Sequence, residues 1–406
     1  MLALQRSFFE SPETFQSIII ELESFEFAGQ RTERVDRDGV PFFYNEFWTA
    51  RQRQAHSLHE VSYRACFKPQ LPSFFISRLT DEGQTVYDPF MGRGTTSIEA
   101  ALSRRNVIGN DVNPLSVYLT RPRITPPSLP QIAARLSRIP WEYDNGDNDE
   151  LLAFYHPQTL TAISALRTYL LEKERSGTLD FIDDWIRMVA INRLTGHSSG
   201  FFSVYSLPPN QAVSVAAQRK INEKRQQIPP HRNVPAIILK KSQSLLRSGA
   251  MTDTVDARLY TSSADNTPQI VTGSVDLVVT SPPFLDVVQY AADNWLRCWF
   301  AGIDTESVEI AMHRKPEAWA GFVRSTFAEL ARVVRPGGHV AFEVGEVRNG
   351  SIQLESLVLD AIKGLDFLPL CVVVNVQEFT KTANCWGVAN NAKGTNTNRI
   401  VLVQRL

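Results

Sequence analysis

The sequence is poor in cysteine and has no obvious metal-binding pattern. Four of its 406 residues are cysteines, none of them in a CxxC pair. Neither a disulfide framework nor a zinc ribbon is therefore indicated, and we interpret these cysteines as buried thiols. The two histidines of HSLHE, at 56 and 59, do not follow the HExxH order of zinc proteases, so we expect no metal site.

Long apolar runs are also missing. None approaches the roughly 20 residues that span a bilayer, and the start, MLALQRSFFESPETF, is too polar for a signal peptide. We therefore expect a cytoplasmic protein that does not associate with membranes. With 43% apolar and 21% charged residues, the chain can form one large domain plus a smaller one or an insertion.

The net charge is close to zero, at -1, but the charges are unevenly distributed. Residues 218–247 contain eight Lys or Arg and one Glu. Such a run is typical of a surface that neutralises phosphates, although a solvated helix face is the common alternative. The candidates for phosphate contacts in this run are Arg219, Lys220, Lys224, Arg225, Arg232, Lys240 and Lys241.

The order of predicted elements indicates an α/β fold. Residues 1–80 look mostly helical, and from Thr85 short apolar strands alternate with helices. This alternation predicts a doubly wound, mostly parallel sheet with helices on both faces. The pattern is interrupted by a largely helical stretch and resumes with strand-like runs at 274–284, 339–346, 369–379 and 398–406. We therefore predict an N-terminal helical extension (1–60), a Rossmann-like domain (61–124 and 255–406) and a helical insertion (125–254).

The segment YDPFMGRGTTSIEAAL, which starts at Tyr87, carries a candidate ligand-binding turn. An acidic residue ends a strand, Gly92 and Gly94 follow, and two threonines open a helix. Glycine allows close approach of a ligand, and a helix N-terminus offers free N–H groups to a carboxylate or phosphate. Asp111 ends the next predicted strand, where a carboxylate can accept both ribose hydroxyls. A plain turn at the glycines and a helix cap at Asp111 remain alternatives. No GxGxxG and no Walker lysine is present.

The strand SVDLVVT leads into Ser281, Pro282, Pro283 and Phe284. Two successive prolines stiffen a loop, while the serine and the aromatic ring offer a hydrogen-bonding edge and a stacking face. The Ser281 hydroxyl and the Pro282 carbonyl are suited to accept two amino protons of a planar base, with Phe284 on the ring. A simple strand terminator is the alternative.

Together these motifs resemble the amino-group DNA methyltransferases, which make N4-methylcytosine or N6-methyladenine. The resemblance implies S-adenosyl-L-methionine as cofactor, double-stranded DNA as substrate, and TSPPF as the catalytic motif. FKPQLPSFFISRL (67–79) resembles the helix over the methionine end of the cofactor, DPFMGRGTT its methionine-binding loop, and SADN (263–266) the segment that contacts its adenine. The cofactor residues implied are Phe67, Lys68, Asp88, Pro89, Phe90, Gly92, Gly94, Thr95, Thr96, Asp111, Asn113 and Asp265.

Several features refine this resemblance. Serine at position 281, where many members have Asp, favours cytosine N4 over adenine N6. Methylation at C5 of cytosine needs a thiolate, usually in a Pro-Cys pair, and no cysteine here follows a proline. The insertion is the predicted target-recognition region. An RNA base methyltransferase and a non-catalytic DNA-binding protein remain alternatives, and a cognate restriction nuclease as partner is left open.

Overall fold

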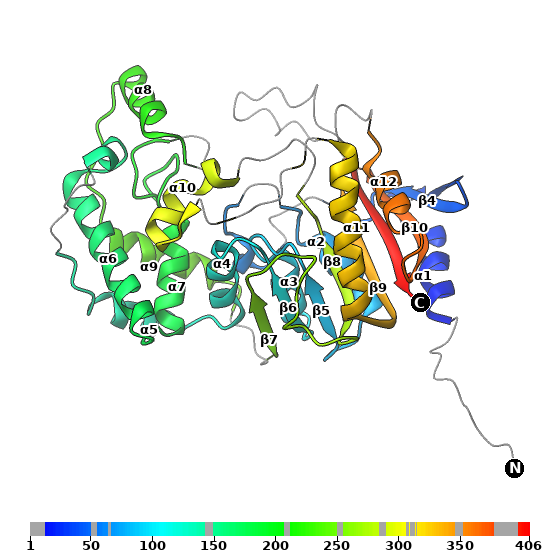
Figure 1. Cartoon of the computed structure of the whole chain (residues 1–406). Helices are drawn as coiled ribbons and strands as arrows, with labels where there is room; N and C mark the ends of the chain where they lie inside the picture. Colours follow the sequence, from blue (N-terminus) through cyan, green and yellow to red (C-terminus); the bar gives the residue numbers. More distant parts are fainter. Residues whose placement is uncertain are drawn as a thin grey trace, which may run out of the picture.

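A computed structural model describes residues 13–49, 55–63, 66–142, 149–206, 212–249, 255–283, 290–305, 308, 313, 315–345, 352–376 and 397–406. The described part contains a large mixed sheet beside a block of helices (Figure 1). Within it, no helix is both long and apolar enough to cross a membrane.

The sheet has nine strands in the order β3-β4-β10-β11-β9-β8-β5-β6-β7. Its parallel half pairs β7 with β6, β6 with β5, β5 with β8, and β8 with β9, whereas β11 is antiparallel to both β9 and β10. The parallel strands are β5 (Thr85–Asp88), β6 (Asn106–Asn110), β7 (Ala257–Tyr260), β8 (Val275–Thr280) and β9 (Val334–Val344), and the antiparallel pair is β10 (Phe367–Val376) and β11 (Thr397–Arg405). This is the mostly parallel α/β sheet that the sequence predicts.

Alternate strand residues face two separate cores, because successive side chains of a strand point to opposite faces. In β8, Leu277 and Val279 belong to one core and Val278 to the other. Helices α2 (Gln70–Leu79) and α3 (Thr95–Leu102) cover the first face, with α4 (Leu115–Ile124) beside β7. Helices α11 (Pro316–Val333) and α12 (Leu354–Ala361) cover the second. The helices on both faces make the fold doubly wound.

The chain changes direction across the sheet between β5 and β8. From β5 it runs outward through β6 to β7, and then returns to place β8 on the other side of β5. In open α/β sheets the crevice at such a switch point, at the carboxyl ends of the strands, is the usual place for a ligand. The topology therefore predicts a site where β5 and β8 end.

The prediction of a helical extension over residues 1–60 is wrong for much of that segment. After helix α1 (Glu13–Ser24) come β1 (Glu26–Phe27) and β2 (Gln30–Arg31), and then β3 (Glu33–Arg37) and β4 (Val40–Asn45) join the main sheet. The β3–β4 turn is formed by Asp38 and Gly39, both with positive φ, as a two-residue hairpin turn requires. β4 lies parallel to β10, which buries Phe42 and Phe43 against opposite cores.

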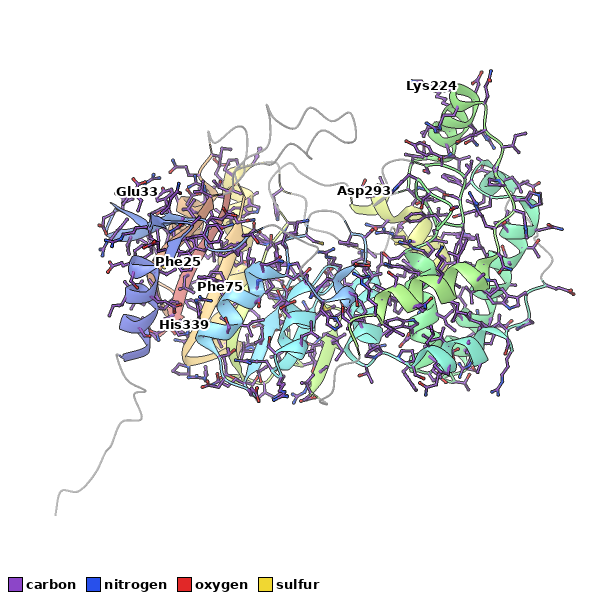
Figure 2. The ribbon with its side chains drawn as sticks, turned by 180° about the vertical axis from the view of Figure 1, so that it is seen from behind. Phe25, Glu33, Phe75, Lys224, Asp293 and His339 are labelled. Atoms are coloured by element: carbon purple, nitrogen blue, oxygen red, sulfur yellow. The ribbon has the colours of Figure 1, made fainter. Side chains whose placement is uncertain are left out.

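The helical block contains α5 (Leu129–Leu136), α6 (Pro157–Arg175), α7 (Phe181–Ile191), α8 (Val215–Arg225) and α9 (Val234–Leu245). Helix α10 (Tyr290–Ala301), which follows the predicted catalytic motif in sequence, packs against α6 and α7 and so belongs to the same block. Figure 2 shows Lys224 on α8 at the outer end of the block and Glu33 of β3 at the opposite end of the molecule.

Candidate active site

The ends of β5 and β8 are joined by a buried hydrogen bond. The Thr280 hydroxyl donates to Oδ1 of Asp88 at 2.6 Å, and the backbone N–H of Phe90 donates to the same oxygen at 3.1 Å. Burial raises the pKa of Asp88 to about 7, although these hydrogen bonds oppose the shift. The aspartate of the glycine turn and the residue before the SPPF motif thus meet at the switch point, across 192 residues of sequence.

The glycine turn lacks side chains at two positions, 92 and 94. Gly92 and Gly94 both have positive φ, and Gly94 precedes the first residue of α3 with no side-chain cap. A Cβ at Gly94 would lie 2.3 Å from Oγ1 of Thr120, so any other residue there would force the Thr120 side chain to shift. The uncapped start of α3 leaves backbone N–H groups for a negatively charged ligand.

Asp111 connects the turn to the end of β6. Its Oδ2 accepts from the Gly92 N–H at 2.8 Å, and its Oδ1 accepts from the Asn113 N–H at 2.9 Å. Each carboxylate oxygen has a second lone-pair position for a ribose hydroxyl. Asn113 itself is buried, and its Oδ1 caps α4 by accepting from Leu115 N at 3.0 Å, so that amide serves the helix.

Asp265 is exposed, and its Oδ1 accepts from the Ser263 hydroxyl at 2.5 Å. The segment that carries it is fixed to the end of β6, because Asn110 Nδ2 donates to the Ser262 carbonyl at 2.9 Å. The SADN segment is therefore adjacent to Asp111 at the carboxyl edge of the sheet.

The remaining predicted cofactor residues lie around this turn. The Thr96 hydroxyl donates to the Val279 carbonyl of β8 at 2.9 Å, and the Thr95 hydroxyl accepts from Arg93 Nε at 3.1 Å. Pro89 is buried, and the Phe90 ring packs at a tilt against Phe322 with ring centroids 5.6 Å apart. Phe67 and Lys68, just before α2, are half-buried.

The backbone of the SPPF motif is fixed from both sides, since Thr96 holds Val279 and Trp319 Nε1 on α11 donates to the Pro283 carbonyl at 2.9 Å. Pro282 is buried, and Ser281 and Pro283 are half-buried. The Phe284 prediction lies outside the described residues.

The structure adds one acid that the sequence reasoning missed. The Glu343 side chain on β9 is buried and hydrogen-bonded to Ser281, and Asn398 Nδ2 donates to its Oε1 at 2.9 Å. Burial raises the pKa of Glu343. The β8–β9 register, with Thr280 opposite Phe342, brings the two residues together. A charged residue inside the apolar run HVAFEV was the signal available in the sequence.

The predicted DNA-binding residues fall into two groups. Arg219, Lys220, Lys224 and Arg225 are exposed on α8, and the Arg225 guanidinium lies 3.7 Å from the ring centre of Tyr205. Lys240 is exposed on α9. Arg232 and Lys241 are half-buried, and Lys241 Nζ lies 3.5 Å from Oε2 of Glu60. Their contact with DNA stays a prediction.

Among the described residues, no group of three or more His, Cys, Asp or Glu side chains is placed to bind a metal ion. The two histidines of HSLHE have other partners. His59 is buried with Nε2 2.6 Å from Oε1 of Glu99, and the His56 side chain accepts from Leu58 N at the start of a short 3-10 turn.

The sequence matches a known family. Residues 12–121 match the model of the N6_N4_Mtase family, described as DNA methylase. A type II methyltransferase of Methanocaldococcus jannaschii is 32% identical over 74 residues, which are 18% of this chain and 14% of the relative. A type II methyltransferase of Kocuria varians is 31% identical over 97 residues, 23% of this chain and 20% of the relative. An orphan methyltransferase of Bacillus amyloliquefaciens is 37% identical over 62 residues, 15% of this chain and 23% of the relative. The chain thus aligns with less than a quarter of the length of each.

Proposed function

We propose that the chain is an S-adenosyl-L-methionine-dependent DNA methyltransferase, because its residues 12–121 match the model of a DNA methylase family. Its target is the exocyclic amino group of a base flipped out of the duplex. The observation that carries this proposal is the contact between Asp88 and Thr280, which joins the glycine turn to the SPPF motif.

The residues present fit the cofactor. The uncapped start of α3 suits its carboxylate, Asp111 suits its ribose hydroxyls, and the SADN segment beside β6 suits its adenine. When bound, S-adenosyl-L-methionine supplies an activated methyl group whose bond to sulfur breaks as the bond to the amino nitrogen forms.

The chain must orient the amino group, because the nitrogen lone pair is delocalised into the base and is a poor nucleophile. Ser281 and the Pro282 carbonyl are placed at the end of β8 to accept the two amino protons and direct the lone pair toward the methyl group. Thr96, Thr280 and Trp319 hold the motif rigid. One proton leaves the nitrogen during transfer, and the Glu343 carboxylate, hydrogen-bonded to Ser281, accepts it through the Ser281 hydroxyl.

Cytosine N4 is the target we propose, since the motif begins with Ser281 rather than Asp. Mass spectrometry of nucleosides from DNA treated with the protein tests this directly. N4-methylcytosine supports the proposal, N6-methyladenine replaces the target base, and 5-methylcytosine refutes the mechanism.

Ser281→Ala tests the catalytic motif. We expect turnover to fall by about a hundred-fold or more, because one acceptor for the amino group is lost, with cofactor affinity nearly unchanged. Ser137→Ala is the matched control, since Ser137 is an exposed serine at the end of α5. Equal turnover of the two variants would remove Ser281 from the chemistry.

A further inference from the structure

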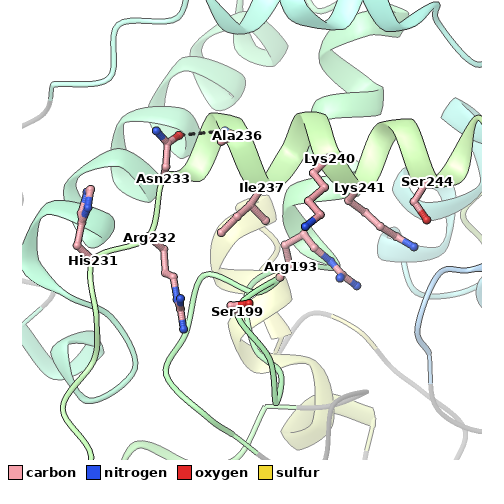
Figure 3. A pocket seen from close by; sticks show the side chains of 11 residues that line it. Arg193, Ser199, His231, Arg232, Asn233, Ala236, Ile237, Lys240, Lys241 and Ser244 are labelled. Carbon is pink, nitrogen blue, oxygen red and sulfur yellow. Dashed lines mark hydrogen bonds between the residues drawn. The ribbon is translucent and has the colours of Figure 1, made fainter.

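Two cavities meet at the junction between the helical block and the sheet. The first, of about 520 Å³, lies along α9 and is lined by Arg193, Arg232, Lys240 and Lys241 among others (Figure 3). The second, of about 400 Å³, is lined by Lys241 and Arg193 again, and by residues before α2 and at the glycine turn, including Tyr63 and Arg93. Because Arg193 and Lys241 line both, the two cavities lie next to each other between α9 and the glycine turn, and we call them together the path.

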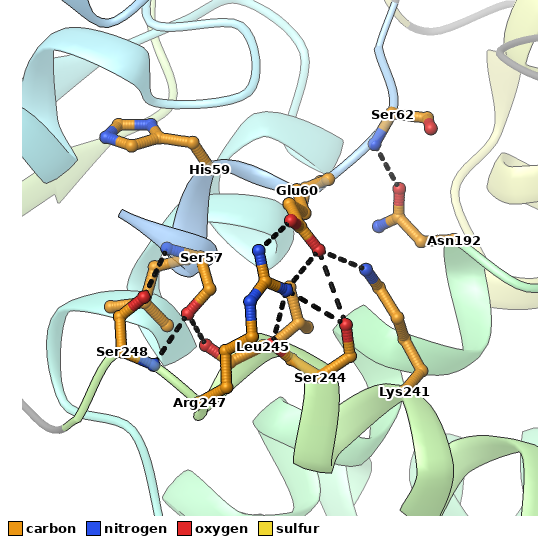
Figure 4. Close-up of polar contacts among 12 residues, drawn as sticks. Ser57, His59, Glu60, Ser62, Asn192, Lys241, Ser244, Leu245, Arg247 and Ser248 are labelled. Atoms are coloured by element: carbon orange, nitrogen blue, oxygen red, sulfur yellow. Dashed lines mark hydrogen bonds and ion pairs between the residues drawn. The ribbon is translucent and has the colours of Figure 1, made fainter. Parts of the chain in front are cut away.

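The lining of this path has an excess of positive charge. Among the described residues, the first cavity has four cationic side chains and no carboxylate. In the second, Glu60 is the one acid in the described lining, and it is already engaged (Figure 4). Arg247 Nη1 lies 2.9 Å from Glu60 Oε2, and the Ser244 hydroxyl and Lys241 Nζ also contact that oxygen.

Arg193 occupies the centre of the path. Its Nε donates to the Asn192 carbonyl at 2.7 Å, and its guanidinium lies 4.0 Å from the ring centre of Phe201. These contacts fix the plane of the guanidinium, and no described carboxylate forms an ion pair with it. Nearby, Nε of Arg232 is buried without a hydrogen-bond partner. A buried donor without an acceptor is costly, so Arg232 calls for an acceptor, and the excess of positive charge around Arg193 favours an anionic one.

Burial also perturbs the protonation of these groups. It lowers the pKa of Arg193 to about 10, with added repulsion from Arg297, and it lowers the pKa of Lys241 to about 8, with added repulsion from Arg193. An anion between them would relieve both effects, since a nearby negative charge favours the protonated forms.

We propose that this path is a phosphate seat, in which Arg193, Lys240 and Arg232 hold a backbone phosphate of the DNA strand that enters the active site. The inference rests on the proposed function and identifies how that substrate is held. A phosphodiester suits the seat because it offers two anionic oxygens to planar guanidinium donors. The second cavity leads from this seat to Tyr63, whose ring would contact a Cβ at Gly92 at 3.6 Å.

The test measures binding of labelled duplex DNA to the full chain by fluorescence anisotropy over a salt series. Arg193→Gln should weaken binding by about ten- to a hundred-fold, and Lys240→Gln should weaken it less. Each should flatten the slope of log affinity against log salt by about one unit. Lys363→Gln, an exposed lysine just after α12 and outside both cavities, is the matched control. Calorimetry with S-adenosyl-L-methionine should give the same affinity for all variants.

A second experiment uses a set of duplexes, each with one phosphate replaced by a neutral methylphosphonate at a different position. It distinguishes a seat that holds one defined phosphate from general electrostatic attraction to the DNA. With the wild-type protein, one position should weaken binding strongly, and Arg193→Gln should abolish that penalty at that position alone. No such position, or equal losses in Arg193→Gln and Lys363→Gln, would overturn the seat while the wild type still methylates DNA. Loss of cofactor affinity in Arg193→Gln would assign the path to the cofactor carboxylate instead. Failure of the wild type to bind duplex DNA would refute the proposed function itself. Lys240 is exposed, so its variant keeps the test valid if Arg193→Gln misfolds.

Discussion

Replacement of Gly94 by alanine should be among the most destabilising single changes in the glycine turn. Two costs add at this position. A left-handed backbone, with φ of +76°, costs a non-glycine residue about 1–2 kcal/mol. The new Cβ would also lie 2.3, 2.5 and 2.9 Å from Oγ1, Cγ2 and Cβ of Thr120 on α4. Forcing an extra carbon into such a packed site costs about 1–3 kcal/mol, so the expected loss of unfolding free energy is about 2–5 kcal/mol.

Gly92→Ala provides the matched comparison. Gly92 also has positive φ, but the nearest atom to its Cβ would be Tyr63 Cε1 at 3.6 Å, an ordinary contact. This variant should lose only the backbone cost, about 1–2 kcal/mol. Urea unfolding followed by circular dichroism measures both values, provided the m-values stay equal.

Thr120→Ala should rescue Gly94→Ala. The substitution removes Oγ1 and Cγ2, the two atoms nearest the new Cβ, and Oγ1 of Thr120 is buried with no hydrogen-bond partner, so no bond is lost. The double variant should be more stable than the sum of the single losses predicts, with a coupling of about 1 kcal/mol or more. Additive losses, or equal losses for Gly92→Ala and Gly94→Ala, would refute the packing argument.

Two further predictions concern the carboxylates of the site. Asp111→Ala should weaken S-adenosyl-L-methionine binding by about 1–3 kcal/mol, because hydrogen bonds to a charged group are lost. Calorimetry checks this, with Asp256→Ala, in an exposed ion pair with Arg258, as control; equal affinities would exclude the ribose role. The raised pKa of Asp88, about 7 against an ordinary 3.8, means that the folded state holds a proton that the unfolded state releases. This contribution is fully present below pH 3.8 and is lost as the pH rises toward 7, with an upper bound of about 4 kcal/mol. Unfolding at a series of pH values should show this slope in the wild type, and Asp88→Asn should lack it.

The local signals in the sequence predicted many elements of the main sheet and its ligand-binding edge. The glycine turn, the strand before Ser281 and the last two strands all formed where expected, because each has a buried apolar run bounded by turn residues. The N-terminal hairpin was predicted as helix, although Asp38-Gly39 marks a two-residue turn. The position of β4 beside β10 depends on long-range pairing, which no window of sequence contains.

The site was predictable in its motifs but not in their partners. Glu343 faces Ser281 only because β8 and β9 pair in the observed register. Arg193 follows α7, and its meeting with Lys241 of α9 depends on how the helices pack. Counting charges along the sequence identified Lys240 and Lys241 as candidate phosphate contacts because they lie in a dense basic run. It missed Arg193 because that residue lies outside the run.

The attachment of α10 to the helical block has a mechanical consequence. Trp295 Nε1 donates to the Val213 carbonyl at 3.2 Å, and Arg167 Nε donates to the Trp299 carbonyl at 2.8 Å, so α10 moves with α6 and its neighbours. Residues 284–289 alone join this helix to Pro283, whose carbonyl Trp319 holds against α11. The helix that follows Pro283 in sequence is therefore held by the helical block, while Pro283 itself is held by α11, so one short stretch of chain connects the two parts of the fold at the predicted catalytic motif.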